Sequence, residues 1–281
     1  MSPRFQTIVP IVTPYGDDGA VLAEAIAAHA SALADAGVDG FFVCGTNGEG
    51  PLLADDEVVT ATRAVAQAAP GRRIIPQVGR PSTRASRELL ERCVEAGATA
   101  VAVITPYFFR VTDEGLREHY RQMIRAADRI PVLAYVIPTY AGNDLSPELA
   151  AELAAAGLAG LKDSTKSRER HEAYVAAREV AGRPEFETFV GEDSMALDAF
   201  RMGSNGVVPA LANFRPELFA ELIAAMTEGD DERAEALQTQ ITETRKATRG
   251  DGIATLKRNV VAMLRGQGVA YSDNGVRAPL R

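Results

Sequence analysis

Eight short runs of apolar and β-branched residues alternate along this chain with segments of helical spacing. The runs cover residues 7–14, 40–45, 73–79, 100–107, 131–138, 158–163, 187–191 and 206–210. The first six segments between them are rich in Ala, Glu and Arg and cover residues 21–36, 54–69, 83–96, 113–127, 147–156 and 167–180. Continuous apolar strands separated by helices are typical of a parallel sheet that is buried on both faces.

Eight such strands predict an α/β fold, a (β/α)8 TIM barrel, which typically needs about 250 residues. A doubly wound sheet is the alternative, but it favours a Gly-rich nucleotide-binding turn after the first strand. Thr13-Pro14-Tyr15-Gly16 does not have that pattern. We expect residues 1–214 to hold the barrel strands and most helices. Residues 215–281 are expected to add the last barrel helix and additional C-terminal helices to the same structural unit.

Bulk composition argues against several classes of protein. A net charge of -8 and a pI near 5.1 argue against nucleic-acid binding, which needs a basic face. The N-terminal residues lack the apolar core of a signal peptide, and no apolar run reaches transmembrane length. Cys44 and Cys93 do not form a Cys-x-x-Cys pair, so we expect reduced, buried side chains. These features predict a cytoplasmic protein that does not contact a membrane.

The few lysines of the chain draw attention to one strand end. Among 30 basic residues only four are lysine, at positions 162, 166, 246 and 257. Lys162 closes the apolar run 158–163, and residues at the carboxyl ends of barrel strands face the active site. Unlike Arg, a Lys in apolar surroundings can lose its proton at working pH. Lys162 is therefore a candidate amine nucleophile that forms a Schiff base with a ketone, the alternative being a solvated surface lysine.

Other strand ends supply groups that such chemistry can use. In the turn Gly45-Thr46-Asn47-Gly48, backbone N–H groups and the Thr46 hydroxyl could bind a small anion such as a carboxylate, although a helix-capping turn has the same pattern. Tyr135, within the fifth run, could relay protons or could simply be a core residue. Glu49 is expected to brace the turn. The remaining residues expected to line the substrate site are Tyr107, Phe108, Tyr140, Gly191, Glu192 and Val208.

A metal-dependent reaction would need clustered ligands at the strand ends. The three histidines, His29, His119 and His171, instead fall in predicted helices. A phosphate-binding turn at residues 203–206 would precede the eighth strand and so lie at the opposite end of the barrel. We therefore predict no metal and no cofactor.

Three motifs in this order resemble those of the dihydrodipicolinate synthase / N-acetylneuraminate lyase family, with similarity from about residue 7 to 277. The motifs are Gly45-Thr46-Asn47-Gly48-Glu49, Tyr135-x-x-Pro138 and Gly160-Leu161-Lys162-Asp163. The resemblance implies that Lys162 forms a Schiff base with pyruvate or a pyruvate-derived 2-oxo acid. It also implies that Tyr135 relays protons and that Thr46 and Asn47 hold the substrate carboxylate. A homotetramer built as a dimer of dimers is implied as well.

Two departures from the family pattern bear on the substrate. Phe108 stands where dihydrodipicolinate synthases have a second Tyr, and Tyr140 stands where they have a carboxylate-binding Arg. A phenol cannot supply a bidentate cationic fork. We therefore expect reversible cleavage of a 2-keto-3-deoxy sugar acid, or a similar hydroxylated 2-oxo acid, to pyruvate and an aldehyde. The alternatives are 4-hydroxy-tetrahydrodipicolinate synthase, a Schiff-base dehydratase of a keto-deoxy sugar acid, and a non-catalytic binding barrel.

Overall fold

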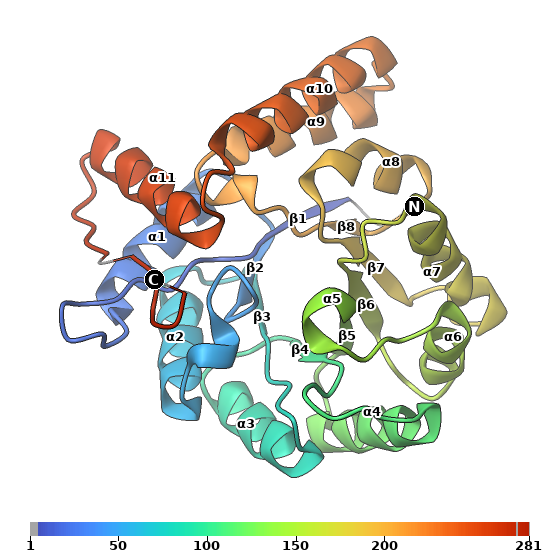
Figure 1. The fold of residues 1–281 in the computed structure, drawn as a ribbon. Helices are drawn as coiled ribbons and strands as arrows, with labels where there is room; N and C mark the ends of the chain where they lie inside the picture. The colour runs from blue at the N-terminus through green and yellow to red at the C-terminus, as the bar shows by residue number, and fades with distance from the viewer. Residues whose placement is uncertain (1–4, 274, 281) are drawn as a thin grey trace.

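Eight parallel strands form a ring at the centre of the molecule, and helices surround it (Figure 1). The computed structural model describes residues 5–273 and 275–280. The strands are β1 (Gln6–Val9), β2 (Gly40–Val43), β3 (Arg73–Pro76), β4 (Val101–Ile104), β5 (Val132–Val136), β6 (Gly160–Asp163), β7 (Glu187–Val190) and β8 (Gly206–Val207). Their spatial order is β3-β2-β1-β8-β7-β6-β5-β4, and a parallel bridge between Gln77 and Ala102 joins the β3 and β4 sides. The predicted (β/α)8 barrel is confirmed.

The helices follow the strands around the ring. They are α1 (Ala23–Asp35), α2 (Asp55–Ala68), α3 (Thr83–Glu95), α4 (Asp113–Ala127), α5 (Pro138–Ala141), α6 (Pro147–Ala155), α7 (Arg168–Val180), α8 (Ala196–Arg201), α9 (Pro216–Glu228), α10 (Asp231–Thr248) and α11 (Ile253–Gly266). Several start at a Ser or Thr whose hydroxyl accepts an otherwise unpaired backbone N–H, as Ser82, Thr112, Ser146 and Ser167 do. These caps explain why the helices begin where the sequence leads one to expect.

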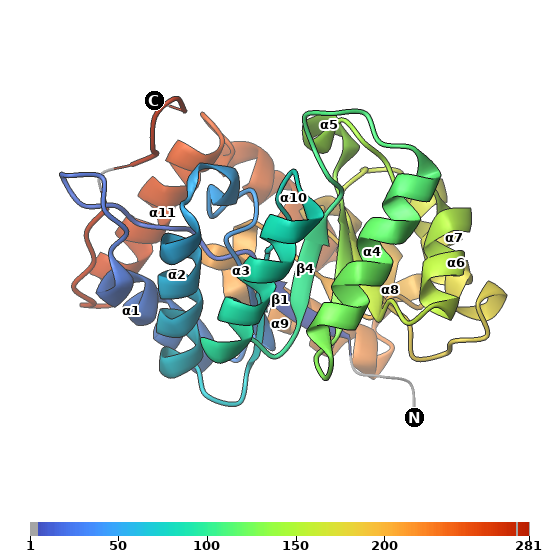
Figure 2. The same cartoon turned by 90° about the horizontal axis from the view of Figure 1, so that it is seen from below.

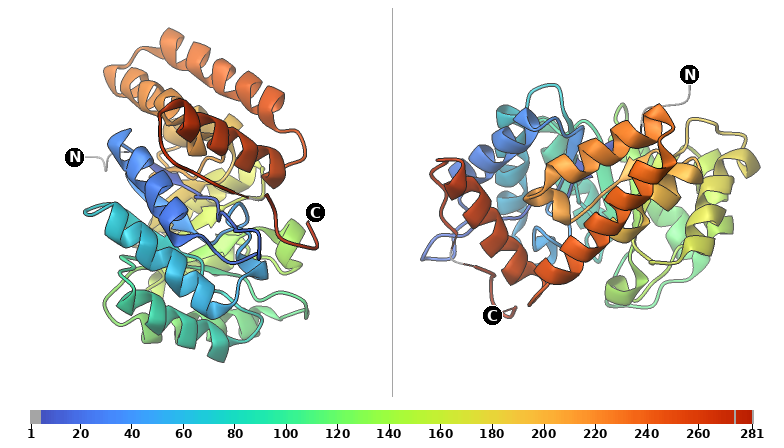
Figure 3. Two further views of the ribbon diagram at one scale, coloured as in Figure 1. Left: turned by 90° about the vertical axis from the view of Figure 1, so that its left-hand side faces the viewer. Right: turned by 90° about the horizontal axis from the view of Figure 1, so that it is seen from above.

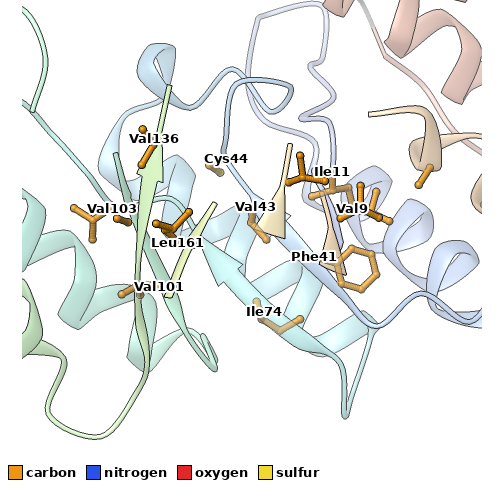
Figure 4. Close-up of a cluster of buried hydrophobic side chains, with 14 of the residues drawn as sticks. Val9, Ile11, Phe41, Val43, Cys44, Ile74, Val101, Val103, Val136 and Leu161 are labelled. Atoms are coloured by element: carbon orange, nitrogen blue, oxygen red, sulfur yellow. The ribbon is translucent and has the colours of Figure 1, made fainter. Parts of the chain in front are cut away.

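Alternation along each strand divides the core into two layers. On β5, Leu133 and Tyr135 point into the barrel, whereas Val132, Ala134 and Val136 pack against the surrounding helices. Figure 4 shows the outer layer, with Val101, Val103, Val136 and Leu161 on neighbouring strands. The inner layer is smaller, and its members are Ile8, Phe42, Ile75, Ala100, Ala102, Ile104, Leu133, Tyr135, Ile137, Ala141, Phe189 and Val208.

The C-terminal helices lie along one flank. Figure 3 shows α9 and α10 side by side, and α11 lies next to α1, where Val260 and Leu264 join Ala25 in a separate apolar cluster. The prediction of extra helices beyond the last barrel helix is confirmed by α10 and α11. None of the described helices is both long and apolar enough to cross a membrane.

The strands are shorter than the apolar runs predicted. The run 7–14 yields a strand that ends at Val9, and the run 206–210 yields one that ends at Val207. Pro10 and Pro209 follow closely in the two cases, and proline has no N–H to continue a strand ladder. The short helix α5 was not predicted; it starts at Pro138, a residue that suits a first helical position.

Candidate active site

Lys162 lies inside the barrel at the carboxyl end of β6, beside Tyr135 of β5, with which it is in register. It is only 5% exposed. Its Nζ atom lies 4.1 Å from the ring centroid of Phe42 and 4.2 Å from that of Tyr135. The surface-lysine alternative is therefore excluded by position, and the amine faces two aromatic rings of the inner layer.

Burial changes the protonation of this amine. Loss of hydration lowers the pKa of Lys162 to about 7, and the carboxylate of Asp193 opposes the shift only in part. At pH 7 a substantial share of the molecules then carries a neutral amine, whereas an ordinary lysine is almost wholly protonated. A neutral amine is the nucleophilic form. The site thus holds a lysine whose neutral form is accessible at neutral pH.

The lowered pKa of Lys162 predicts a pH dependence for capture of pyruvate. The rate of borohydride-trappable adduct formation at low pyruvate concentration should rise about tenfold per pH unit below pH 7, because only the neutral amine attacks. It should level off above pH 7. Initial trapping rates between pH 5 and 10 would measure this, and a rise that continues to pH 10 would show an ordinary lysine.

Tyr135 and Thr46 form a hydroxyl pair next to the amine. The Thr46 Oγ1 atom lies 2.9 Å from the Tyr135 Oη atom, and either can be the donor. Burial raises the pKa of Tyr135 to about 12, although hydrogen bonds to Thr46 and Ser164 oppose the rise. The phenol is therefore protonated at neutral pH and is connected to a second hydroxyl, as a proton relay requires.

Ser164 is a site residue that the sequence analysis missed. It follows β6 two residues after Lys162, and its hydroxyl reaches both Tyr135 and Gly191. A Cβ on Gly191 would overlap the Ser164 hydroxyl and lie 3.1 Å from Lys162 Cε. Gly191 is thus required by close approach. The sequence Lys162-Asp163-Ser164 could have predicted this position. A side chain two positions beyond an inward-facing residue points to the same side of a strand.

The turn after β2 holds Thr46 in a constrained backbone. Cys44 and Glu49, at its two ends, have φ angles of 54° and 55°, a region that residues with side chains rarely occupy. The Gly50 amide donates to the Gly45 carbonyl at 3.0 Å, and a Cβ on Gly50 would overlap the Cys44 carbonyl oxygen. Within the described residues, the backbone amides of Thr46 and Asn47 have no hydrogen-bond acceptor. They are available for a ligand oxygen, as a carboxylate-binding turn needs.

Glu49 does brace this turn, but through partners far away in the sequence. Its Oε1 accepts from Lys257 at 3.1 Å, and its Oε2 accepts the backbone N–H of Arg277 at 2.8 Å. Cys44 is buried and unpaired with another cysteine, as expected.

Residues that follow β7 and β8 complete the site on the side next to β6. Val208 is buried in the inner layer. The Glu192 carboxylate lies 3.2 Å from the Nζ atom of Lys166, which belongs to the loop after the neighbouring strand β6. Asp193 is buried and accepts the Leu211 N–H at 2.8 Å, so it joins the loop after β7 to the loop after β8. Because its carboxylate is occupied by Leu211 and Arg245, Asp193 is placed to connect these loops rather than to contact a substrate.

Three aromatic residues lie at the rim rather than beside the amine. Tyr107 is half-buried against the inner layer, and burial raises its pKa. Phe108 and Tyr140 are 86% and 73% exposed. Figure 2 shows α5, which carries Tyr140, at the same end of the barrel as the C-terminus and opposite the N-terminus. Tyr140 is nevertheless close enough to Tyr135 to contribute to the raised pKa of that phenol.

Each of the three histidines lies on a helix and forms a hydrogen bond with another protein group. His29 bonds the Asn213 carbonyl, His119 bonds the Thr83 hydroxyl, and His171 bonds Asp163. The part of the chain that the structure describes has no group of three or more His, Cys, Asp or Glu side chains placed to hold a metal ion.

Sequence comparison connects this geometry to known proteins. A model of the dihydrodipicolinate synthetase family matches residues 4–280. A relative from Halobacterium salinarum, described as an uncharacterized DapA-like lyase, is 38% identical over 98% of this chain and 87% of its own length. Other relatives, such as one from Anaeromyxobacter sp. strain K at 36% identity over 84% of this chain and 79% of its own, are named 4-hydroxy-tetrahydrodipicolinate synthase.

Two solved structures are closely similar. A prophage protein of the dihydrodipicolinic acid synthase family from E. coli K12, in complex with pyruvate, matches with a TM-score of 0.89 and 26% identity over 98% of this chain and 92% of that chain. KD(P)GA from T. tenax matches with a TM-score of 0.87 and 31% identity, again over 98% and 92%.

Proposed function

The chain belongs to the dihydrodipicolinate synthetase family, and from that premise we propose that it is a lyase in which Lys162 forms a Schiff base with a 2-oxo acid. The observation that carries the proposal is a buried amine of lowered pKa beside a phenol–hydroxyl pair. The relative from E. coli holds pyruvate, which supports a small 2-oxo acid as the ligand. A non-catalytic barrel would have no use for such an amine.

Imine formation assigns a task to each group. The neutral Lys162 amine adds to the keto carbon, and the substrate carboxylate lies on the free amides of Thr46 and Asn47. Tyr135 donates a proton to the hydroxyl of the addition product, which leaves as water. The phenol is left deprotonated, and Thr46 stabilises it through the 2.9 Å hydrogen bond.

Cleavage then uses the same phenol in reverse. Tyr135 accepts the proton of the substrate hydroxyl as the adjacent carbon–carbon bond breaks, and an aldehyde leaves. The electron pair of the broken bond passes into the imine, which becomes an enamine. Protonation of the enamine carbon and addition of water release pyruvate and return the free Lys162 amine.

The rim residues favour a hydroxylated 2-oxo acid that has a single carboxylate. The phenol of Tyr140 supplies no cation for a second carboxylate, and Phe108 offers no hydroxyl to a relay. Reversible cleavage of a 2-keto-3-deoxy sugar acid is therefore the reaction we propose. The synthase names among relatives about one-third identical favour 4-hydroxy-tetrahydrodipicolinate synthase as the second candidate.

Substrate choice follows as a prediction. A charge-assisted hydrogen bond contributes about 1.5–3 kcal/mol, so a site without the carboxylate-binding Arg should lose roughly tenfold to a hundredfold in recognition of aspartate semialdehyde. Catalytic efficiency should be higher for pyruvate release from at least one 2-keto-3-deoxy sugar acid than for condensation of pyruvate with aspartate semialdehyde. The reverse order across the whole sugar-acid panel would assign the synthase reaction instead.

We also propose that the protein forms a homotetramer, with residues 1–214 and 215–281 as one structural unit. The exposure of Phe108 and Phe109, whose rings stack edge to face 4.9 Å apart, supports an interface at the rim.

A further inference from the structure

A buried charge cluster lies behind the turn that carries Thr46. Lys257 of α11 is almost fully buried, and its Nζ atom lies 3.1 Å from Glu49 and 3.2 Å from Asp273. Both carboxylates are buried as well. Burying three charges is costly unless their geometry is well determined, so such a cluster indicates a segment held in one place. The proposed chemistry does not itself use Lys257.

The segment that follows α11 holds the second half of the β2–α2 connection and the start of α2. We call its described residues 271–273 and 275–277 the C-terminal strap; Figure 1 shows this dark red segment beside the blue connection. The Arg277 amide donates to Glu49, and the Arg277 guanidinium donates to both carboxylate oxygens of Glu57, at 2.6 and 2.8 Å. The same guanidinium donates to the Leu52 carbonyl at 2.9 Å. The strap therefore holds the turn at Glu49, the short 3-10 helix Gly50–Leu52 and the first turn of α2.

The turn needs this outside support because its own backbone is strained. Cys44 and Glu49 both have positive φ angles, and such conformations persist in residues with side chains only where surrounding contacts fix them. Thr46 lies between these two residues. Among the described residues that precede β2, only Thr13 makes a side-chain hydrogen bond to this turn. Its hydroxyl donates to the Gly48 carbonyl at 2.7 Å.

We propose that Lys257 and Arg277 are positioning residues of the active site. Through Glu49 and Glu57 they hold the turn so that the Thr46 hydroxyl stays in hydrogen-bond contact with Tyr135. The inference rests on the proposed function, because it concerns the relay that serves Lys162. It extends the site to Lys257 and Arg277, which lie more than 200 positions after Glu49 in the sequence.

The chain offers a matched control for the Arg277 anchor. Arg73 and Glu187 form a second bidentate ion pair, with nitrogen–oxygen distances of 2.9 and 2.8 Å, at the amino ends of β3 and β7. The side chains of that pair are 24% and 23% exposed, compared with 22% and 26% for Arg277 and Glu57. Arg73→Met and Arg277→Met therefore remove similar ion pairs at opposite ends of the barrel.

Exchange of the pyruvate methyl hydrogens in D2O measures the relay without any second substrate. Lys162 forms the imine with loss of water, a proton leaves C3 to give the enamine, and a deuteron from the solvent returns to C3. Hydrolysis then releases deuterated pyruvate. Arg277→Met should slow this exchange by roughly tenfold to a hundredfold relative to Arg73→Met, because a small displacement of a catalytic group has effects of this size. Arg277→Met also loses hydrogen bonds to the Leu52 and Gly19 carbonyls, so its melting temperature should equal or lie somewhat below that of Arg73→Met.

A second arm separates positioning from general loss of stability. In a Tyr135→Phe background, Arg277→Met should slow the exchange much less than it does in the wild type, because residues that act as a unit are not additive. If Arg277→Met does not fold, Glu57→Gln and its control Glu187→Gln test the same pair with unchanged shape. Exchange in the strap variants as fast as in their controls would overturn the inference, as would an equal loss in both backgrounds. If the wild type exchanges no deuterium and traps no pyruvate, the proposed function fails instead.

Discussion

Lys162→Arg should abolish both product formation and covalent capture of pyruvate, although it keeps the positive charge. A guanidinium is effectively always protonated and is a poor nucleophile, whereas the pKa of the Lys162 amine lies near 7. The loss should reach the detection limit of a pyruvate-release assay. Residual activity above about one-hundredth of the wild-type rate would mean that another group performs the chemistry.

Lys162→Met serves as the control for folding. Its unbranched apolar side chain suits the space between the rings of Phe42 and Tyr135, and it removes the cost of a buried amine. This variant should also be inactive, and its melting temperature should equal or exceed that of the wild type. A lower melting temperature would indicate that the amine stabilises the barrel, contrary to a site that retains Lys162 for its reactivity.

Tyr135→Phe should lower turnover about 10²–10⁴-fold, the usual range for loss of a positioned proton donor. The ring stays, so its edge-to-face contact with Phe42 and the fold should survive. Steady-state kinetics on the best sugar-acid substrate would measure the loss.

Tyr120→Phe is the matched control for that variant. Tyr120 is also buried, but its hydroxyl donates to the Val103 carbonyl at 3.0 Å on the outer side of β4. Its loss should lower stability by about 1 kcal/mol and leave turnover unchanged. Equal turnover in the Tyr135 and Tyr120 variants would return Tyr135 to the role of a core residue.

The fold was predictable because parallel strands impose a simple pattern. A strand buried on both faces must be apolar throughout, so eight such runs separated by helices indicated a closed parallel sheet. The same geometry brings strand ends together, so the pattern also indicated that Lys162 and Tyr135 share one mouth of the barrel. The two residues are in register on neighbouring strands. Their catalytic roles stay predictions, as do those of Thr46 and Asn47.

Other features depend on contacts that no local pattern encodes. Glu49 binds partners 208 and 228 residues away, and their approach depends on how α11 and the C-terminal strap pack. Ser164 was missed because a serine after a strand is also a common turn residue. The exposure of Phe108 and Tyr140 depends on the length of β4 and β5 and on the short helix α5, which a single Pro starts.

Borohydride reduction in the presence of pyruvate, followed by peptide mapping, tests the central claim most directly. Lys162 is buried beside the proposed relay, whereas Lys166 is largely exposed and paired with Glu192. One reduced adduct per chain on the peptide that contains Lys162 is the predicted result. The absence of an adduct, or an adduct on Lys166, would contradict the assignment of Lys162 as the Schiff-base lysine.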